Sequence, residues 1–166
     1  EMGVTLDTSM SPATTVASIT TSKSAGTFSA GEIVDIQVTF TDQVFLPGEM
    51  PTLLMNTFGL ALYYSGKDTD ILIFRYISTE SDSTSKLDWS LDEATNSAIM
   101  CAYPCVMKNA NNVGVDLQFH DSIVEPLEPI IALDSSPPSI ISITSCCTIC
   151  NSRPINSTIN TILNRK

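Results

Sequence analysis

Five cysteines carry the most evident chemistry in this chain, and they form two groups. Cys101 and Cys105 flank Ala102-Tyr103-Pro104, a turn-forming segment that a bridge could span. The second group comprises Cys146, Cys147 and Cys150. Cys-x-x-Cys is also a zinc-ligand spacing, but no second well-spaced Cys or His pair completes such a site. We therefore expect disulfides, and the odd count leaves one thiol that is free or pairs with another chain.

Carboxylates are the second group of residues with possible chemistry, because Ca²⁺ takes oxygen ligands. The candidates are Asp68, Asp70, Asp82, Asp88, Asp92 and Glu93, with Asp7 and Asp134 at two similar stretches of sequence. None of them matches the EF-hand loop spacing. A solvated acidic surface without a cofactor is the favoured interpretation, and a calcium site is the alternative.

The chain offers little for catalysis. His120 is the only histidine, and its neighbours Asp121 and Ser122 would alternate across the two faces of a strand. The sequence contains no nucleophile elbow, no glycine-rich phosphate loop and no His-x-x-x-His metal pair. We expect no enzymatic activity.

Charge and composition restrict the partners and the compartment. With 18 acidic and 8 basic residues the formal charge is −10, which disfavours nucleic acids and anionic membranes. No apolar run approaches the ~18–20 residues that span a bilayer. Charged residues make up only 16% of the chain, and Ser and Thr replace them, as in many secreted β proteins. Residue 1 is Glu, which predicts a processed form or a piece of a longer protein. We expect a secreted or cell-surface location.

The elements that would position these residues are strands. Val34, Ile36, Val38 and Phe40 alternate with polar residues, as do the apolar residues of 113–119. Residues 71–77 are apolar on both faces apart from Arg75, which predicts a central strand. Further strands are expected at 14–21, 52–56, 60–65 and within 99–107. Residues 90–96 resemble a short helix or a loop turn. About seven short strands indicate an all-β, antiparallel β-sandwich.

The chain also repeats itself. VTLDTS at 4–9 returns as IALDSS at 131–136, an offset of 127, and ASITT at 17–21 returns as ISITS at 141–145, an offset of 124. IVDIQV at 33–38 is echoed by TINTIL at 158–163. We therefore expect a linker or strand at 1–11, a sandwich module at 12–125, a Pro-rich linker at 126–138, and the opening strands of an incomplete second repeat at 139–166.

The ordered series of motifs resembles a known family. The stretches are AGEIVDIQVTF at 30–40, PTLLMNT at 51–57, ALYYSG at 61–66, LIFRY at 72–76, KLDW at 86–89 and the junction LDSSPP at 133–138. Together they resemble the tandem Ig-like repeats of large secreted and cell-surface proteins of bacteria, algae and other protists. The resemblance implies an Ig-like sandwich and a structural or adhesive role, with no catalytic residues to carry over. The chain departs from the bacterial pattern in having few glycines and several cysteines.

Sites of glycosylation are a further expectation. Asn156-Ser157-Thr158 is an N-glycosylation sequon. Ser11-Pro12 and Ser136-Pro137-Pro138 resemble the Ser-Pro contexts that are glycosylated in algal and plant wall proteins.

Two functions are compatible with these features. In the first, the chain is a subunit of an extracellular filament or surface layer, and copies assemble head to tail by strand complementation. The donated residues would be Ile141, Ile143, Ile159 and Leu163 of the second repeat, or Val4 and Leu6 near the N-terminus. In the second, the chain is an adhesive module of a long repeat protein that binds glycans or proteins. Its aromatic platform would use Tyr103 or Trp89, although Trp89 is a better candidate for the core.

Overall fold

The protein folds into β-strands joined by turns. A computed structural model describes residues 13–48, 50–101, 107–119 and 126–135. Residue contacts divide the chain into Glu1–Ser135 and Ser136–Lys166, and only the first unit contains described residues. The described part contains no helix, and so none with the length and apolarity for a membrane crossing. The expected second repeat at 139–166 lies outside the described residues.

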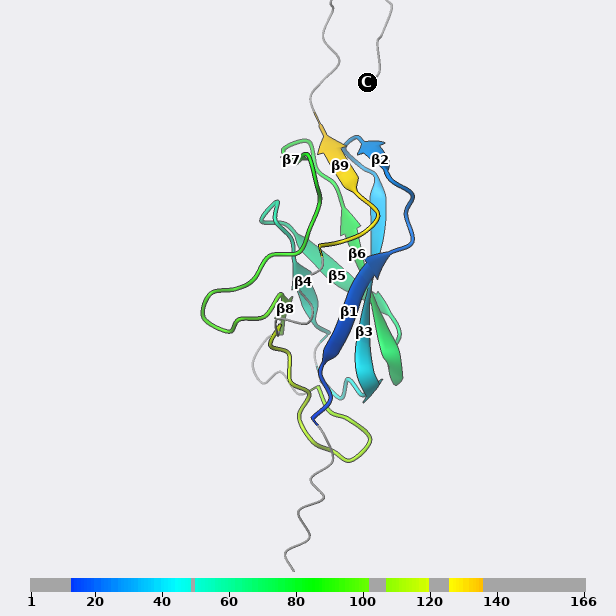
Figure 1. Cartoon of the computed structure of the whole chain (residues 1–166), viewed down its shortest axis with the longest axis vertical. Coiled ribbons are helices and arrows are strands. Elements are labelled where there is room, and N and C mark those ends of the chain that lie inside the picture. Colours follow the sequence, from blue (N-terminus) through cyan, green and yellow to red (C-terminus); the bar gives the residue numbers. More distant parts are fainter. Residues whose placement is uncertain (1–12, 49, 102–106, 120–125, 136–166) are drawn as a thin grey trace, which may run out of the picture. The chain divides into compact units, whose positions relative to one another are not determined.

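The larger of two sheets has six strands. Its order is β1 (Val16–Thr21), β3 (Ile33–Val44), β6 (Thr69–Ile77), β5 (Leu60–Ser65), β4 (Thr52–Leu54) and β8 (Ile99–Met100), all antiparallel. The sheet curls as it passes from β1 to β8 (Figure 1). The prediction that residues 71–77 form a central strand is confirmed, because β6 lies between β3 and β5.

The smaller sheet consists of β2 (Gly26–Phe28), β9 (Ile131–Asp134) and β7 (Ser83–Thr84), which lie at one end of the six-stranded sheet (Figure 1). β9 is its middle strand and pairs antiparallel with β7 but parallel with β2, so the described sheets are not wholly antiparallel. The two sheets are consistent with a β-sandwich. Nine strands are described rather than about seven, because β2, β7 and β9 were not expected, while residues 113–119 form no strand.

Alternation of side chains along the strands builds the core. Val34, Ile36 and Val38 of β3 are fully buried, and so are Leu72 and Phe74 of β6. These residues share the inward face because successive side chains on a strand point to opposite sides. Burial of one such side chain stabilises the fold by about 1.5–3 kcal/mol relative to exposure.

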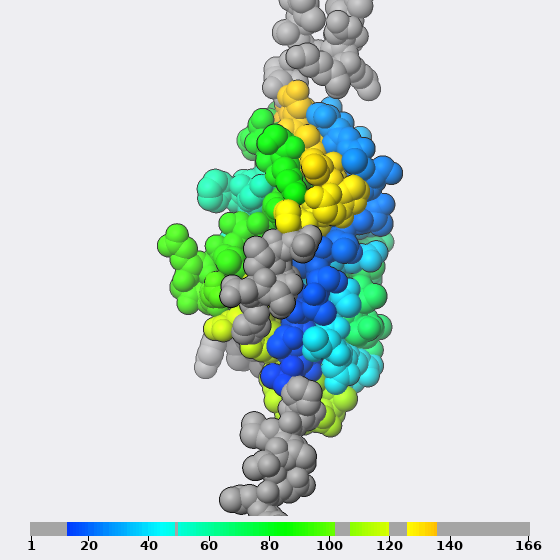
Figure 2. Space-filling view, in the orientation of Figure 1, coloured from blue at the N-terminus to red at the C-terminus, as the bar shows by residue number. Residues whose placement is uncertain are grey.

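The expected linker at 126–138 is wrong for its first part. Leu127 and Ile131 are fully buried, and Leu133 is 2% exposed. The Leu87 N–H donates to the Ile131 carbonyl at 2.6 Å, which ties β9 to the loop after β7. The segment lies between the N-terminal part and the β7 region on the surface of the module (Figure 2). Prolines at 126 and 129 suggested a linker, but β9 begins beyond both and its pairing is unaffected.

One other expectation needs correction, and one of two alternatives is confirmed. Residues 113–119 form no strand, and this segment makes only single bridges, from Gly114 to Lys108 and from Asp116 to Thr15. Its alternation has no continuous partner strand, so no ladder forms. Of the two alternatives for residues 90–96, the loop turn is confirmed, because the Asp92 carboxylate accepts hydrogen bonds from the N–H groups of Ala94 and Thr95. Such side-chain capping favours turns over helix interiors.

Candidate functional site

The outward face of the six-stranded sheet carries an ion pair at its centre. Arg75 of β6 donates from Nε to Asp35 Oδ1 at 2.7 Å and from Nη2 to Asp35 Oδ2 at 2.8 Å. The two residues are cross-strand neighbours in the β3–β6 register. The Arg75 guanidinium also lies over the Tyr64 ring, with 3.6 Å between the guanidinium carbon and the ring centroid. Both partners of the pair are about 30% exposed.

The electrostatics of this pair follow from the bidentate contact. Hydrogen bonds from Arg75 hold the pKa of the Asp35 carboxyl below its usual range, against a smaller opposing effect of burial. The same hydrogen bonds to Asp35 raise the pKa of Arg75. The pair is therefore ionised at neutral pH, and its two charges cancel on this face.

Large apolar side chains surround the ion pair. Leu62 lies directly opposite Arg75 and is 59% exposed, and Tyr64 is 56% exposed. One outward row further along, Ile77 of β6 pairs with Ile33 of β3, and both are exposed. Leu60 at the start of β5 is also exposed. The outer face (Ile33, Leu60, Leu62, Tyr64, Ile71, Arg75, Ile77 and Met100, with Asp35) thus has an apolar surface around a neutralised charge.

Polar residues border this outer face on one side. The outward residues of the β1–β3 side are Ser18, Thr20, Gln37 and Thr39. Contiguous exposed apolar patches mark interaction sites on soluble proteins. An apolar centre that contains Tyr and Arg, with a polar rim, is the usual anatomy of a protein–protein interface.

Next to the outer face, the turn between β4 and β5 projects an aromatic side chain. Phe58 is 91% exposed and has a φ of 62°, a left-handed conformation that costs a bulky residue energy. A buried network holds this turn. The Tyr76 hydroxyl donates to Asp82 Oδ2 at 2.6 Å, and Tyr76 Oη lies 2.7 Å from Thr57 Oγ1.

The network shifts the pKa values of its two acids. Burial, and then the hydrogen bond to Asp82, raise the pKa of Tyr76 to about 12. Burial also acts to raise the pKa of Asp82, but hydrogen bonds from Tyr76 and from the Thr79 N–H outweigh it, so the net direction is downward. Both shifts stabilise the protonated tyrosine and the ionised aspartate.

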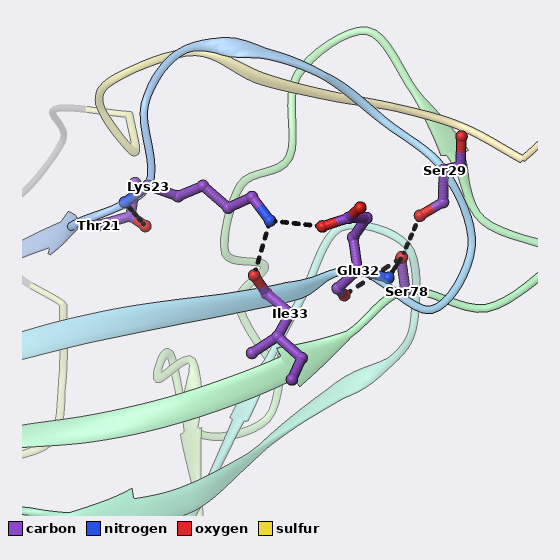
Figure 3. Close-up of polar contacts among 6 residues, drawn as sticks. All are labelled: Thr21, Lys23, Ser29, Glu32, Ile33 and Ser78. Atoms are coloured by element: carbon purple, nitrogen blue, oxygen red, sulfur yellow. Dashed lines mark hydrogen bonds and ion pairs between the residues drawn. The ribbon is translucent and has the colours of Figure 1, made fainter.

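The corner where β2 leads into β3 is fixed by a second set of polar contacts (Figure 3). Lys23 Nζ donates to Glu32 Oε2 at 2.9 Å and to the Ile33 carbonyl at 3.0 Å. Ser78 Oγ donates to the Ser29 carbonyl at 2.8 Å, and the Glu32 N–H donates to Ser78 Oγ at 3.1 Å. These bonds place Ile33 at the edge of the outer face with its neighbouring charges paired.

The closing strand β9 is a second candidate surface for assembly. It fills the space between β2 and β7 with Ile131 and Leu133, and Ser135 Oγ then donates to the Thr79 carbonyl at 2.8 Å. Its sequence IALD has a near copy, VTLD, at residues 4–7. Val4 and Leu6, which the sequence singled out for assembly, therefore correspond to the two buried residues of β9.

The candidate calcium ligands are not gathered together. Asp82 and Asp92 accept hydrogen bonds as described above, and Asp88 Oδ1 accepts from the Trp89 and Leu127 N–H groups. Among the described residues, no group of three or more His, Cys, Asp or Glu side chains is arranged to hold a metal ion. Asp68, Asp70, Glu93 and Asp134 belong to no such group either, and Asp7 lies outside the described residues.

Among the cysteines and aromatic residues singled out above, two are described. Cys101 is disulfide-bonded, and its partner lies outside the described residues. Trp89 packs partly buried against the core and its ring lies 4.9 Å from that of Phe119, so its expected core position is confirmed. Its Nε1 is buried without a hydrogen-bond partner within the described part of the chain.

The other predicted site residues lie outside the described residues. They are Cys105, Cys146, Cys147 and Cys150; Ser11, Pro12, Ser136, Pro137, Pro138 and Asn156; Ile141, Ile143, Ile159 and Leu163; and Tyr103 and His120.

Sequence reasoning missed the outer face. The available signal was the apolar character of both faces of residues 71–77, which predicted burial on both sides. One face of β6 is buried, while on the other Ile71 and Ile77 are exposed because no described segment covers them.

Comparison with known proteins adds no relative to this description. No protein-family model, no curated protein and no solved structure matches the chain.

Proposed function

We propose that this chain is a structural and adhesive unit of a secreted or cell-surface protein, an Ig-like β-sandwich joined end to end with further copies of the same module. The chain has no enzymatic role in this proposal. Its role is structural, because a folded module of fixed length sets the distance between the segments on either side of it.

One observation carries the proposal: the sequence repeat and the structural module share a boundary. The described module begins with β1 and closes with β9. The stretch that matches β9 lies at 4–7, before β1, and the stretch that matches β1 lies at 141–145, after β9. One repeat of sequence thus corresponds to one folded module. Such a match is expected where modules follow one another along a chain.

The mode of joining has two versions. In the covalent version, residues 4–7 are the closing strand of a preceding module and 139–166 open the following one. In the strand-complementation version, these segments complete modules of other copies. The described module favours the covalent version, because its own β1, β3 and β9 are in place and a donated strand would have to displace one of them.

The test is the mass and morphology of the material from its native source. The covalent version predicts a polypeptide whose mass is several times 17.9 kDa and in which peptides of this sequence occur. Strand complementation predicts a single-module polypeptide that forms fibres in negative-stain images and loses them on Leu6→Asp or Ile143→Asp. A single-module polypeptide that forms no fibres, as the parent chain or as either variant, would refute the proposal.

A further inference from the structure

We propose that the outer face of the six-stranded sheet is a pairing surface that binds the same face of a second copy. The residues that carry this inference are Leu62, Tyr64 and Arg75, with Ile77, Ile33 and Leu60 next to them. They come from three adjacent antiparallel strands, so backbone hydrogen bonds rather than loops hold them in place.

Charge selects the partner. The chain has a formal charge of −10, so two copies repel each other, and they repel least where the surfaces in contact carry no net charge. On the outer face Arg75 and Asp35 neutralise each other through two hydrogen bonds, and at its edge Lys23 pairs with Glu32. A strongly basic partner gains nothing from a neutral face, whereas a second neutral, apolar face matches it.

Area and shape are also suitable. Seven large apolar side chains of the outer face are between 36% and 59% exposed, and a standard interface buries ~800 Å² per partner. Two sheets can pack face to face about 10 Å apart with their strands rotated by about 30°. Because both copies present the same surface, the contact is isologous and closes as a dimer.

The central residues are of the types that dominate interface energies. Tyr64 is held by the Arg75 guanidinium over its ring, so little side-chain freedom remains to be lost on binding. Tyr and Arg are enriched among residues that carry most of the binding energy. Ser18, Thr20, Gln37 and Thr39 supply the hydrated rim.

Pairing extends the proposed function without depending on it. If modules follow one another in an array, two parallel arrays can make one weak contact per module at the same time. The overall avidity between the arrays is then much higher than the affinity of a single contact. A single chain would show the same contact as a monomer–dimer equilibrium.

The experiment is sedimentation equilibrium of the full chain from about 1 to 500 μM, in low and high salt. We expect a dimer of twice 17.9 kDa that is strengthened by salt, since salt screens the repulsion between two acidic copies. Leu62→Glu should raise the dissociation constant at least tenfold, and Ile77→Glu should do the same. The fold should survive in both, because both side chains are more than half exposed and circular dichroism can verify it.

The matched control is Val113→Glu, the same change in charge at a half-exposed apolar residue outside the six-stranded sheet. This variant should dimerise as the parent does. A parent chain that stays monomeric at 500 μM would overturn the inference, as would a dimer that Leu62→Glu and Val113→Glu weaken equally. A dimer that survives Leu62→Glu but is lost on Leu6→Asp would be strand exchange, which also overturns the inference but leaves the proposed function standing.

Discussion

Truncation of Leu133 tests whether β9 closes the module, and the chain provides its own control at Leu6. Leu133 occupies the third position of IALD in β9 and is 2% exposed, next to the fully buried Ile131. Leu6 occupies the third position of the related VTLD. Leu133→Ala and Leu6→Ala are therefore the same substitution in two copies of one motif, and only the first lies in a strand of the described module.

The expected effect of Leu133→Ala is a loss of about 3 kcal/mol in the free energy of unfolding. Removal of three carbon groups costs about 0.8 kcal/mol each in lost burial, and the cavity adds to this sum. The strand is short and lies at one end of the module, so partial collapse of the cavity keeps the total in the lower half of the usual ~2–5 kcal/mol range. The corresponding fall in Tm is about 10 °C.

The assay is urea unfolding of the full chain, followed by Trp89 fluorescence at two protein concentrations. Leu6→Ala should change the free energy of unfolding by less than about 0.5 kcal/mol at either concentration. Equal destabilisation by the two substitutions would mean that residues 4–7 fill a slot of the same kind in another copy. A negligible effect of Leu133→Ala would refute the argument that β9 closes the core.

Three further predictions concern the turns and the buried network. Gly66→Ala should destabilise the β5–β6 hairpin by about 2–4 kcal/mol, because φ at Gly66 is +101° and an added Cβ would lie 2.0 Å from the Ile71 carbonyl oxygen. The control is Gly48→Ala, where the space around the glycine is open. In the same urea titration this control should change the free energy of unfolding by less than about 0.5 kcal/mol. The raised pKa of Tyr76 means that its protonated hydroxyl contributes stability that is fully present below pH 10 and is lost as the pH rises through about 12. Absorbance at 295 nm should therefore show a late-titrating tyrosine that Tyr76→Phe removes. A late-titrating tyrosine that remains in this variant would contradict the assignment. The lowered pKa of Asp82 means that its ionised carboxylate contributes stability when the pH is above about 4, the pKa in the unfolded chain, and that this stability is lost as the pH falls further. Asp82→Asn should therefore be less stable at neutral pH, and its stability should fall less steeply with acid. A fall as steep as in the parent would count against the network.

The strands that sequence reasoning located correctly are those with one buried face and a continuous partner. Residues 34–40 alternate because β3 has core on one side only, and 71–77 were located because Leu72, Phe74 and Tyr76 of β6 face the same core. The same alternation at 113–119 misled, because periodicity reports which residues face a core and not whether a partner strand is present. β9 was not predicted as a strand of this module, because it has only four residues and follows two prolines, a pattern that suggested a linker.

The outer face illustrates what the sequence leaves open. An apolar run such as 71–77 predicts burial on two sides, but whether a second layer covers a sheet depends on segments far away in the chain. Here the second sheet consists of short strands at one end of the larger sheet, and no described segment covers the outer face, so Ile77 and Leu62 remain exposed. The pairing of Arg75 with Asp35 depends likewise on the β3–β6 register, and nothing local in either strand encodes that register.

Amide hydrogen exchange across residues 131–134 tests the central claim most directly, namely that β9 belongs to the module that precedes it in the chain. The account predicts slow exchange at these amides, with an opening free energy close to that of global unfolding and no dependence on protein concentration. Rapid exchange at 131–134, or protection that appears only at high concentration, would contradict it, because β9 would then be a free segment or a strand held by another copy.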